Sequence, residues 1–147
     1  MDASSGAMFD VILLVGLVLA AWYGPRVVRD VMGKVPMARP ESVRDRLDRG
    51  EDVLVLDVRN PGEFTGPHGH IPDAVNIPLG ELSKKAGDPH AGLDEYKDVP
   101  VIAVCRTDSR SYTAARMLRQ LGFRDVSCMR GGMSKWNRLG YPVRRLG

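Results

Sequence analysis

The sequence predicts an α/β domain with a central parallel sheet and helices on both faces, and three observations lead to this prediction. From residue 53 onward, short apolar runs typical of strands alternate with stretches of helical periodicity. This alternation is typical of parallel sheets with helical crossovers. The run 101–104 is apolar throughout, as in a strand covered on both faces. Cys105 follows that run and precedes a helical stretch, at the strand end where such sheets bind ligands.

An apolar segment precedes this domain. Residues 11–23 are thirteen apolar residues, which as a helix would cover about 20 Å of a hydrocarbon core about 30 Å thick. Extending the segment to residues 8–28 brings it near spanning length, and Trp22 and Tyr23 resemble an interfacial aromatic belt. At Pro25 the helix can end or kink.

Three interpretations of the segment compete. A secretory signal peptide needs basic residues before its apolar core, and residues 1–10 contain none. A buried core helix would have one apolar stripe, whereas this segment is apolar all round. A single-pass membrane anchor fits best, and the basic residues after it predict a cytoplasmic domain. We expect an anchor and linker over residues 1–35 and the domain over residues 36–147.

The other elements follow from local patterns. After a linker at 34–39, a helix is expected from Pro40 to Gly50, because Val43 and Leu47 lie four residues apart between a helix-starting proline and a helix-ending glycine. The remaining helices are expected at 79–86, 111–121 and 133–139, and the strands at 53–58, 74–77, 101–104 and 126–129. A turn at 59–64 that can open one helical turn, a loop at 66–72 and an irregular segment at 87–98 connect them.

Composition excludes several classes of function. The formal net charge of +3 comes without any run of five like charges, which indicates a solvated surface rather than nucleic-acid binding. The two cysteines, Cys105 and Cys128, form neither a disulfide framework nor a CxxC pair. Cys128 is predicted to pack in the sheet as an inert thiol. The three histidines lie in Gly/Pro-rich loop sequence, so we expect no metal and no cofactor.

The stretch from Cys105 to Arg110 is the predicted reactive site. A loop that leads into a helix N-terminus offers N–H groups and a positive dipole end to an anion, and the same field favours a thiolate. The alternative is a buried cysteine that acts only as a small hydrophobe. The spacing alone leaves both interpretations open.

Longer patterns around this stretch resemble the rhodanese family. Its first signature is similar to residues 56–59, 63–64 and 69–78, its active-site loop to 104–111, and its C-terminal pattern to 122–123, 126, 131–132, 136 and 140–143. The match covers residues 36–145 in order and leaves out residues 1–35. The resemblance implies a rhodanese fold and sulfurtransferase chemistry.

In that family the loop cysteine attacks the outer sulfur of thiosulfate or a persulfide and passes it to a thiol or cyanide. By motif position Cys105 is the nucleophile and sulfur carrier. The loop residues implied to bind the substrate are Arg106, Thr107, Asp108, Ser109 and Arg110, with both arginines holding an anionic donor. Structural roles near the site are expected for Asp57, Arg59, Glu63 and His70, including an Arg59–Glu63 ion pair.

Two alternative functions are weighed against this one. Phosphatases with a related loop place five residues between cysteine and arginine, whereas four separate Cys105 from Arg110, so the loop is expected to be too tight for phosphate. A non-enzymatic sulfur-relay or docking module for a membrane protein is the other alternative. The retained Cys105 argues against a docking module without chemistry.

Asp108 departs from the glycine that many family loops carry. A loop curled around sulfur can require a left-handed residue there, which Asp tolerates. Its charge also opposes a thiolate and an anionic donor unless Arg106 or Arg110 neutralises it. Low thiosulfate activity, or a sulfur donor with a neutral or cationic end, is therefore an alternative to efficient use of thiosulfate. We predict that Asp108→Gly raises the turnover of thiosulfate, measured as thiocyanate formed from cyanide. An unchanged or lower rate would remove this argument.

Overall fold

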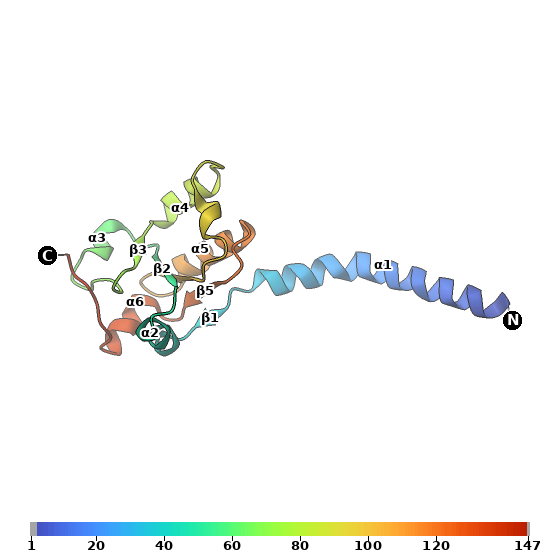
Figure 1. Cartoon of the computed structure of the whole chain (residues 1–147), viewed down its shortest axis with the longest axis horizontal. Coiled ribbons are helices and arrows are strands. Elements are labelled where there is room, and N and C mark those ends of the chain that lie inside the picture. The colour runs from blue at the N-terminus through green and yellow to red at the C-terminus, as the bar shows by residue number, and fades with distance from the viewer. Residues whose placement is uncertain (1–2, 147) are drawn as a thin grey trace. The chain divides into compact units, whose positions relative to one another are not determined.

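The computed structural model describes residues 3–146, with side-chain placement for residues 6, 8–25 and 33–146. Contacts between Cα atoms divide the chain into two compact units, Met1–Lys34 and Val35–Gly147, one residue from the boundary expected from the sequence. Figure 1 labels most of the helices and strands of the two units. The first unit is helix α1 (Ala3–Gly33).

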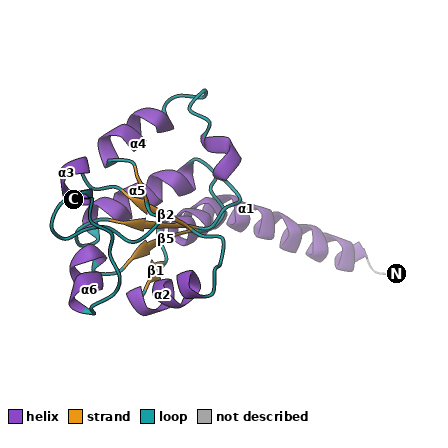
Figure 2. Cartoon of the chain, turned by 60° about the vertical axis from the view of Figure 1, so that its left-hand side comes forward, coloured by secondary structure: helices purple, strands orange, loops and turns teal. Residues whose placement is uncertain are grey.

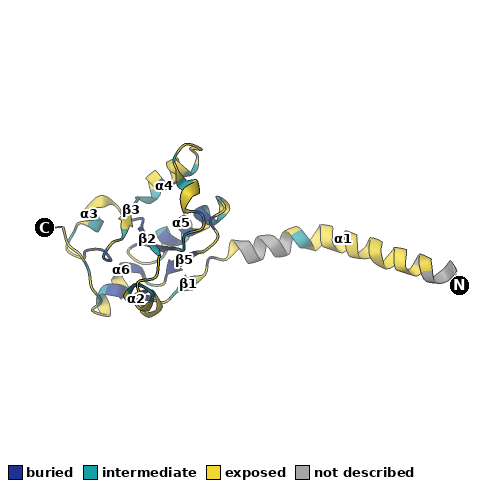
Figure 3. Cartoon of the chain, viewed as in Figure 1, coloured by how far each residue is buried: buried dark blue, intermediate teal, exposed yellow. Residues whose placement is uncertain are grey.

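Helix α1 is mostly apolar, and almost all of its described residues are exposed. The stretch Met8–Pro25 has a mean hydropathy of 1.8, and none of it is buried within the protein (Figure 3). The helix is therefore long and apolar enough to cross a membrane. It continues past Pro25 to Gly33, so the proline does not end it. The basic side chains predicted to follow the segment, Arg26 and Arg29, lie outside the described side chains.

The second unit is built around a parallel sheet (Figure 2), and its strand order is β1-β5-β4-β2-β3. Its strands are β1 (Met37–Ala38), β2 (Leu54–Asp57), β3 (Val75–Asn76), β4 (Val101–Val104) and β5 (Val126–Met129). Every residue of the central strand β4 is buried, as its apolar sequence predicts. In register, Ala103 of β4 pairs with Leu56 of β2 and with Cys128 of β5.

Strand β1 was not predicted, because residues 34–39 read as a linker. It pairs with β5, where the N–H of Cys128 donates to the carbonyl of Pro36 at 2.9 Å and that of Arg130 donates to Ala38 at 2.9 Å. A strand of two residues between prolines is too short to show the alternation that identifies a strand in sequence.

Helices cover both faces of the sheet, as expected (Figure 2). Helices α2 (Pro40–Asp48) and α6 (Gly132–Arg138) pack on one face, and α4 (Leu79–Ala86) and α5 (Ser109–Gln120) on the other. Because side chains alternate along a strand, the sheet contributes side chains to two hydrophobic cores, one on each face. The α2/α6 core contains Val43, Val55, Ile102 and Trp136, and the α4/α5 core contains Leu82, Ala103, Leu118 and Cys128.

Two local differences from the predicted elements bear on the site or its surroundings. Helix α5 begins at Ser109, so Arg110 lies on its first turn rather than in the loop before it. The segment 87–98, predicted to be irregular, contains the 3-10 helix η1 (Leu93–Tyr96). The turn after β2 contains the short helix α3 (Pro61–Phe64), in agreement with the helical turn that its sequence allows.

Candidate active site

Cys105 follows the central strand β4 at the carboxyl end of the sheet, and its residue is only 1% exposed. From residue 106 to residue 111, the backbone N–H groups donate to no protein group in the described part of the chain. These groups lie at the N-terminal end of α5, where the helix dipole adds a partial positive charge. A buried sulfur is thus followed by a run of free donors suited to an anion.

The loop conformation at Asp108 differs from the expected one. Asp108 has φ −149° and ψ −6°, so it is not left-handed, and the argument that this position favours glycine for its backbone is wrong. Its carbonyl accepts the N–H of Tyr112 at 2.9 Å, which starts the helical hydrogen bonds of α5. Asp108 therefore acts as the N-cap residue, although its side chain makes no capping bond.

Arg110 is bound to Glu63 of α3. Its two terminal nitrogens donate to the carboxylate oxygens of Glu63 at 2.7 and 2.9 Å. The Glu63 side chain also accepts the N–H of Asn60 at 3.1 Å, in a capping box. Hydrogen bonding from Arg110 lowers the pKa of Glu63 from 4.5 to about 2. The bidentate geometry commits the Arg110 guanidinium to the protein, which leaves it less free to hold a donor.

Arg59 pairs with Asp57 rather than with Glu63, so the predicted Arg59–Glu63 ion pair is wrong. The Arg59 Nη2 lies 2.7 Å from the Asp57 Oδ2, and the side chains of Arg59 and Asp57 are 3% and 1% exposed. Arg59 also donates to the carbonyls of Gly69 at 2.8 Å and Glu63 at 3.3 Å. The prediction paired Arg59 with Glu63 because four residues is a helical spacing. The backbone at the end of β2 instead places the Arg59 side chain against Asp57, two residues earlier.

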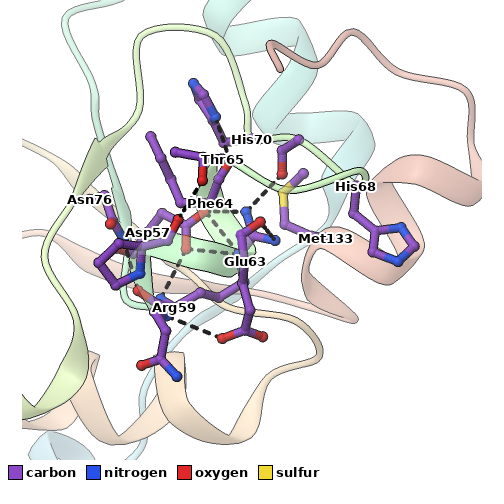
Figure 4. A network of polar contacts seen from close by, with 12 residues as sticks. Asp57, Arg59, Glu63, Phe64, Thr65, His68, His70, Asn76 and Met133 are labelled. Atoms are coloured by element: carbon purple, nitrogen blue, oxygen red, sulfur yellow. Dashed lines mark hydrogen bonds and ion pairs between the residues drawn. The ribbon is translucent and has the colours of Figure 1, made fainter. Parts of the chain in front are cut away.

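Figure 4 shows how this pair is surrounded by the following loop. Asn76 of β3 donates to the carbonyls of Asp57 at 3.0 Å and Arg59 at 2.8 Å. The His70 ring stacks on Phe64, with centroids 3.7 Å apart, and its Nδ1 lies 2.8 Å from the Phe64 carbonyl. His70 thus fastens the loop to α3.

The cysteine loop is also held from the side of α6. The N–H groups of Met133 and Ser134 donate to the carbonyls of Cys105 at 2.8 Å and Arg106 at 3.0 Å. At Gly132 φ is +54°, and a Cβ there would collide with the carbonyl oxygens of Thr107 and Cys105. Glycine is therefore required by close approach as well as by conformation.

A second thiol lies beneath the loop. Cys128 is fully buried in the sheet, as predicted, and burial raises its pKa to about 11. Ser111 of α5 lies between the two cysteines, with its Oγ 3.3 Å from the Cys105 Sγ and 3.1 Å from the Cys128 Sγ. The sequence offered no signal for this contact, because it joins the residue after β4, a residue of α5 and a residue of β5.

A cleft of about 640 Å³ opens beside the loop. Its walls include Gly66 and His68 from the loop after α3, Arg106, and Ser134 and Arg138 of α6. Arg106 and Arg138 are exposed, and neither forms an ion pair within the described residues. Thr107 and Ser109 are also exposed on the loop. Nowhere in the described chain do three His, Cys, Asp or Glu side chains group to hold a metal ion.

Fold and site together define an α/β domain with a cysteine loop at the carboxyl end of its central strand. The profile of the rhodanese-like domain family matches residues 39–139, and the chain belongs to this family. It is 38% identical over 103 residues to a sulfurtransferase of Allochromatium vinosum, a match that covers 70% of this chain and 89% of that protein.

Other relatives carry related names. The thiosulfate sulfurtransferase GlpE of Pseudoalteromonas translucida is 35% identical over 86 residues, which cover 58% of this chain and 74% of GlpE. The structure of the human single-domain sulfurtransferase TSTD1 is similar with a TM-score of 0.59 and 25% identity, over 71% of this chain and 97% of the human one. The family relationship supports sulfur transfer as the general chemistry of this domain.

The buried ion pair yields a prediction about stability. Arg59→Ala leaves the Asp57 carboxylate buried without its partner, and we expect the free energy of unfolding to fall by about 3–5 kcal/mol. The measurement is urea unfolding of the full chain in detergent. Adding Asp57→Asn should recover part of the loss. Arg124→Ala, which removes the exposed pair with Asp98, serves as control and should have little effect. A loss for Arg59→Ala no larger than that of the control would contradict this interpretation.

The Arg110–Glu63 pair yields a pH dependence. Because folding lowers the pKa of Glu63 from 4.5 to about 2, the ionised pair stabilises the fold fully above pH 4.5, and this contribution is lost as the pH falls through about 2. The unfolding free energy of the wild type minus that of Glu63→Gln, measured from pH 7 downward, should be constant to about pH 4.5 and then decline. A difference that rises as the pH falls would exclude this assignment.

Proposed function

We propose that this protein is a sulfurtransferase that carries sulfur as a persulfide on Cys105. The observation that supports this best is the buried sulfur beside free backbone N–H groups at the start of α5. In loading, the Cys105 thiolate attacks the outer sulfur of the donor. With thiosulfate, a new S–S bond forms to Cys105, the donor S–S bond breaks, and sulfite leaves with the electron pair. The N–H groups of residues 106–110 stabilise the anionic persulfide.

The donor is proposed to be an organic persulfide with anionic groups rather than thiosulfate alone. Thiosulfate fills only a small part of a 640 Å³ cleft, which is in the range of sites for drug-sized ligands, about 300–1,000 Å³. Arg106 and Arg138 supply cationic groups for carboxylates at a distance from the reacting sulfur, whereas the charge of Arg110 is matched by Glu63. The acceptor is a small thiol or cyanide.

We also propose that α1 anchors the protein in a membrane as a single pass through residues 8–28, with the domain in the cytoplasm. The apolar exposed stretch Met8–Pro25 supports the anchor. The sequence positions of Arg26, Arg29 and Lys34 after this stretch support the orientation. A membrane protein is then a natural neighbour for sulfur delivery.

Intact-mass measurement tests the persulfide. After incubation with glutathione persulfide, the full-length protein in detergent should gain one sulfur atom, about 32 Da. The gain should be absent in Cys105→Ser and retained in Cys128→Ser. Loading should be faster with glutathione persulfide than with thiosulfate at equal concentration. No adduct with either donor would overturn the proposed function, and loading without any discharge to cyanide or thiols would favour a non-enzymatic carrier.

Alkaline carbonate washing tests the anchor. Full-length protein should stay in the membrane pellet, and a variant lacking residues 1–34 should move to the supernatant. Recovery of the full-length chain in the supernatant would exclude a spanning helix.

A further inference from the structure

Three buried groups form a continuous chain of contacts at the base of the site. Cys105, Ser111 and Cys128 are each no more than 1% exposed. The Ser111 Oγ lies 3.3 Å from the sulfur of Cys105, 3.1 Å from that of Cys128 and 3.2 Å from the carbonyl oxygen of Asp108. The function proposed above uses Cys105 alone.

The fold fixes this arrangement. Cys128 is opposite Ala103 in the pairing of β5 with β4, and Cys105 follows Ala103 by two residues. Because strand side chains alternate, both thiols belong to the face covered by α5. Ser111 is a buried residue on the first turn of that helix, and its hydroxyl contacts both sulfurs.

The protons available to these three groups determine which of them donates each hydrogen bond. A Cys105 thiolate has no proton and can only accept a hydrogen bond. Cys128 keeps its proton at neutral pH, since burial raises its pKa to about 11. The Cys128 S–H can therefore donate to the Ser111 oxygen, which at 3.1 Å is nearer than its other acceptors, the carbonyl oxygens of Asp108 at 3.7 Å and Met129 at 4.0 Å. The single Ser111 proton then points either to Cys105 or to the Asp108 carbonyl.

We propose that the Ser111 hydroxyl, oriented by the Cys128 thiol, stabilises the Cys105 thiolate as the leaving group when sulfur passes to the acceptor. Ser111 and Cys128 are positioning residues for this step, and the inference rests on the proposed function. In the persulfide state the negative charge lies on the outer sulfur, and the Ser111 proton turns to the Asp108 carbonyl. It returns to Cys105 as charge develops there.

The discharge step balances without a proton. The cyanide carbon attacks the outer sulfur, a C–S bond forms, and the S–S bond to Cys105 breaks. Its electron pair stays on the Cys105 sulfur, and thiocyanate leaves. Stabilising the departing thiolate accelerates this step.

Loading responds differently to the same contact. A less stabilised Cys105 thiolate is less abundant but more nucleophilic, with a Brønsted coefficient of about 0.4–0.5. These two effects oppose each other. Loss of the hydrogen bond should therefore slow discharge more than loading.

The test measures loading and discharge separately in the full-length protein in detergent. Each variant is loaded with glutathione persulfide, its occupancy is measured by intact mass, and the discharge to cyanide is followed in a single turnover. We expect discharge about tenfold slower in Ser111→Ala, because a hydrogen bond to a charged group is lost. Cys128→Val should slow it about threefold, whereas Cys128→Ser, which keeps a donor, should stay within about twofold of the wild type. Loading should change less than discharge in every variant.

Ser127→Ala is the matched control, because it removes a serine hydroxyl next to Cys128 on the strand, where side chains alternate faces. Wild-type discharge in a loaded Ser111→Ala overturns the inference. Equal slowing of loading and discharge also overturns it. Should Ser111→Ala fail to fold, slow discharge in Cys128→Val with recovery in Cys128→Ser supports the inference, and equal rates in these two overturn it. Failure of the wild type to load with any donor overturns the proposed function itself.

Discussion

The buried ion pair between Asp57 and Arg59 is the interaction on which the arrangement around the site depends. A guanidinium and a carboxylate removed from water are tolerable only when their remaining hydrogen-bonding capacity is used. Arg59 uses it on the carbonyls of Glu63 and Gly69, which fixes both α3 and the loop after it relative to β2. Glu63 is thereby held where its carboxylate reaches Arg110 on the first turn of α5. The start of that helix is thus tied, through two ion pairs in series, to the end of a neighbouring strand.

The cysteine loop is held by α3 on one side and by α6 on the other. These contacts determine which of its charged groups are bound within the protein. Arg110 faces α3 and is matched by a carboxylate, while the carbonyls of Cys105 and Arg106 accept from the first turn of α6. The carbonyls of Cys105 and Arg106 are thus hydrogen-bonded within the protein, whereas the N–H groups of residues 106–111 donate to no protein group in the described chain and remain for a ligand. Cationic charge toward the cleft comes from Arg106 and Arg138.

Local patterns in the sequence were sufficient for most of the fold. Helix α4 and strands β4 and β5 lie where apolar periodicity predicts them, because burial on one or both faces leaves a local signal. Strand β1 left none, since two residues acquire their identity only from pairing with β5. The partners of Arg59 and Glu63 were misassigned for a related reason: sequence spacing suggested a helical contact, while tertiary geometry brought Arg110 from 47 residues away. The position of Ser111 between two thiols likewise depends on the strand register and on where α5 begins.

The burial of Cys105 affects which form of the protein, loaded with sulfur or unloaded, a thiol can reach. With 1% of the residue exposed, the bare sulfur lies below the protein surface, whereas an attached sulfur atom extends the reactive end outward by one bond. In the proposed cycle the loaded form is thus the more accessible form. A bulky thiol can meet the outer sulfur yet is hindered from reaching the emptied cysteine, so mixed disulfides that would stall the cycle are sterically disfavoured. Because the Cys105 sulfur is recessed, the shape of the site distinguishes the persulfide form of the protein from the free thiolate form, and no moving lid is needed.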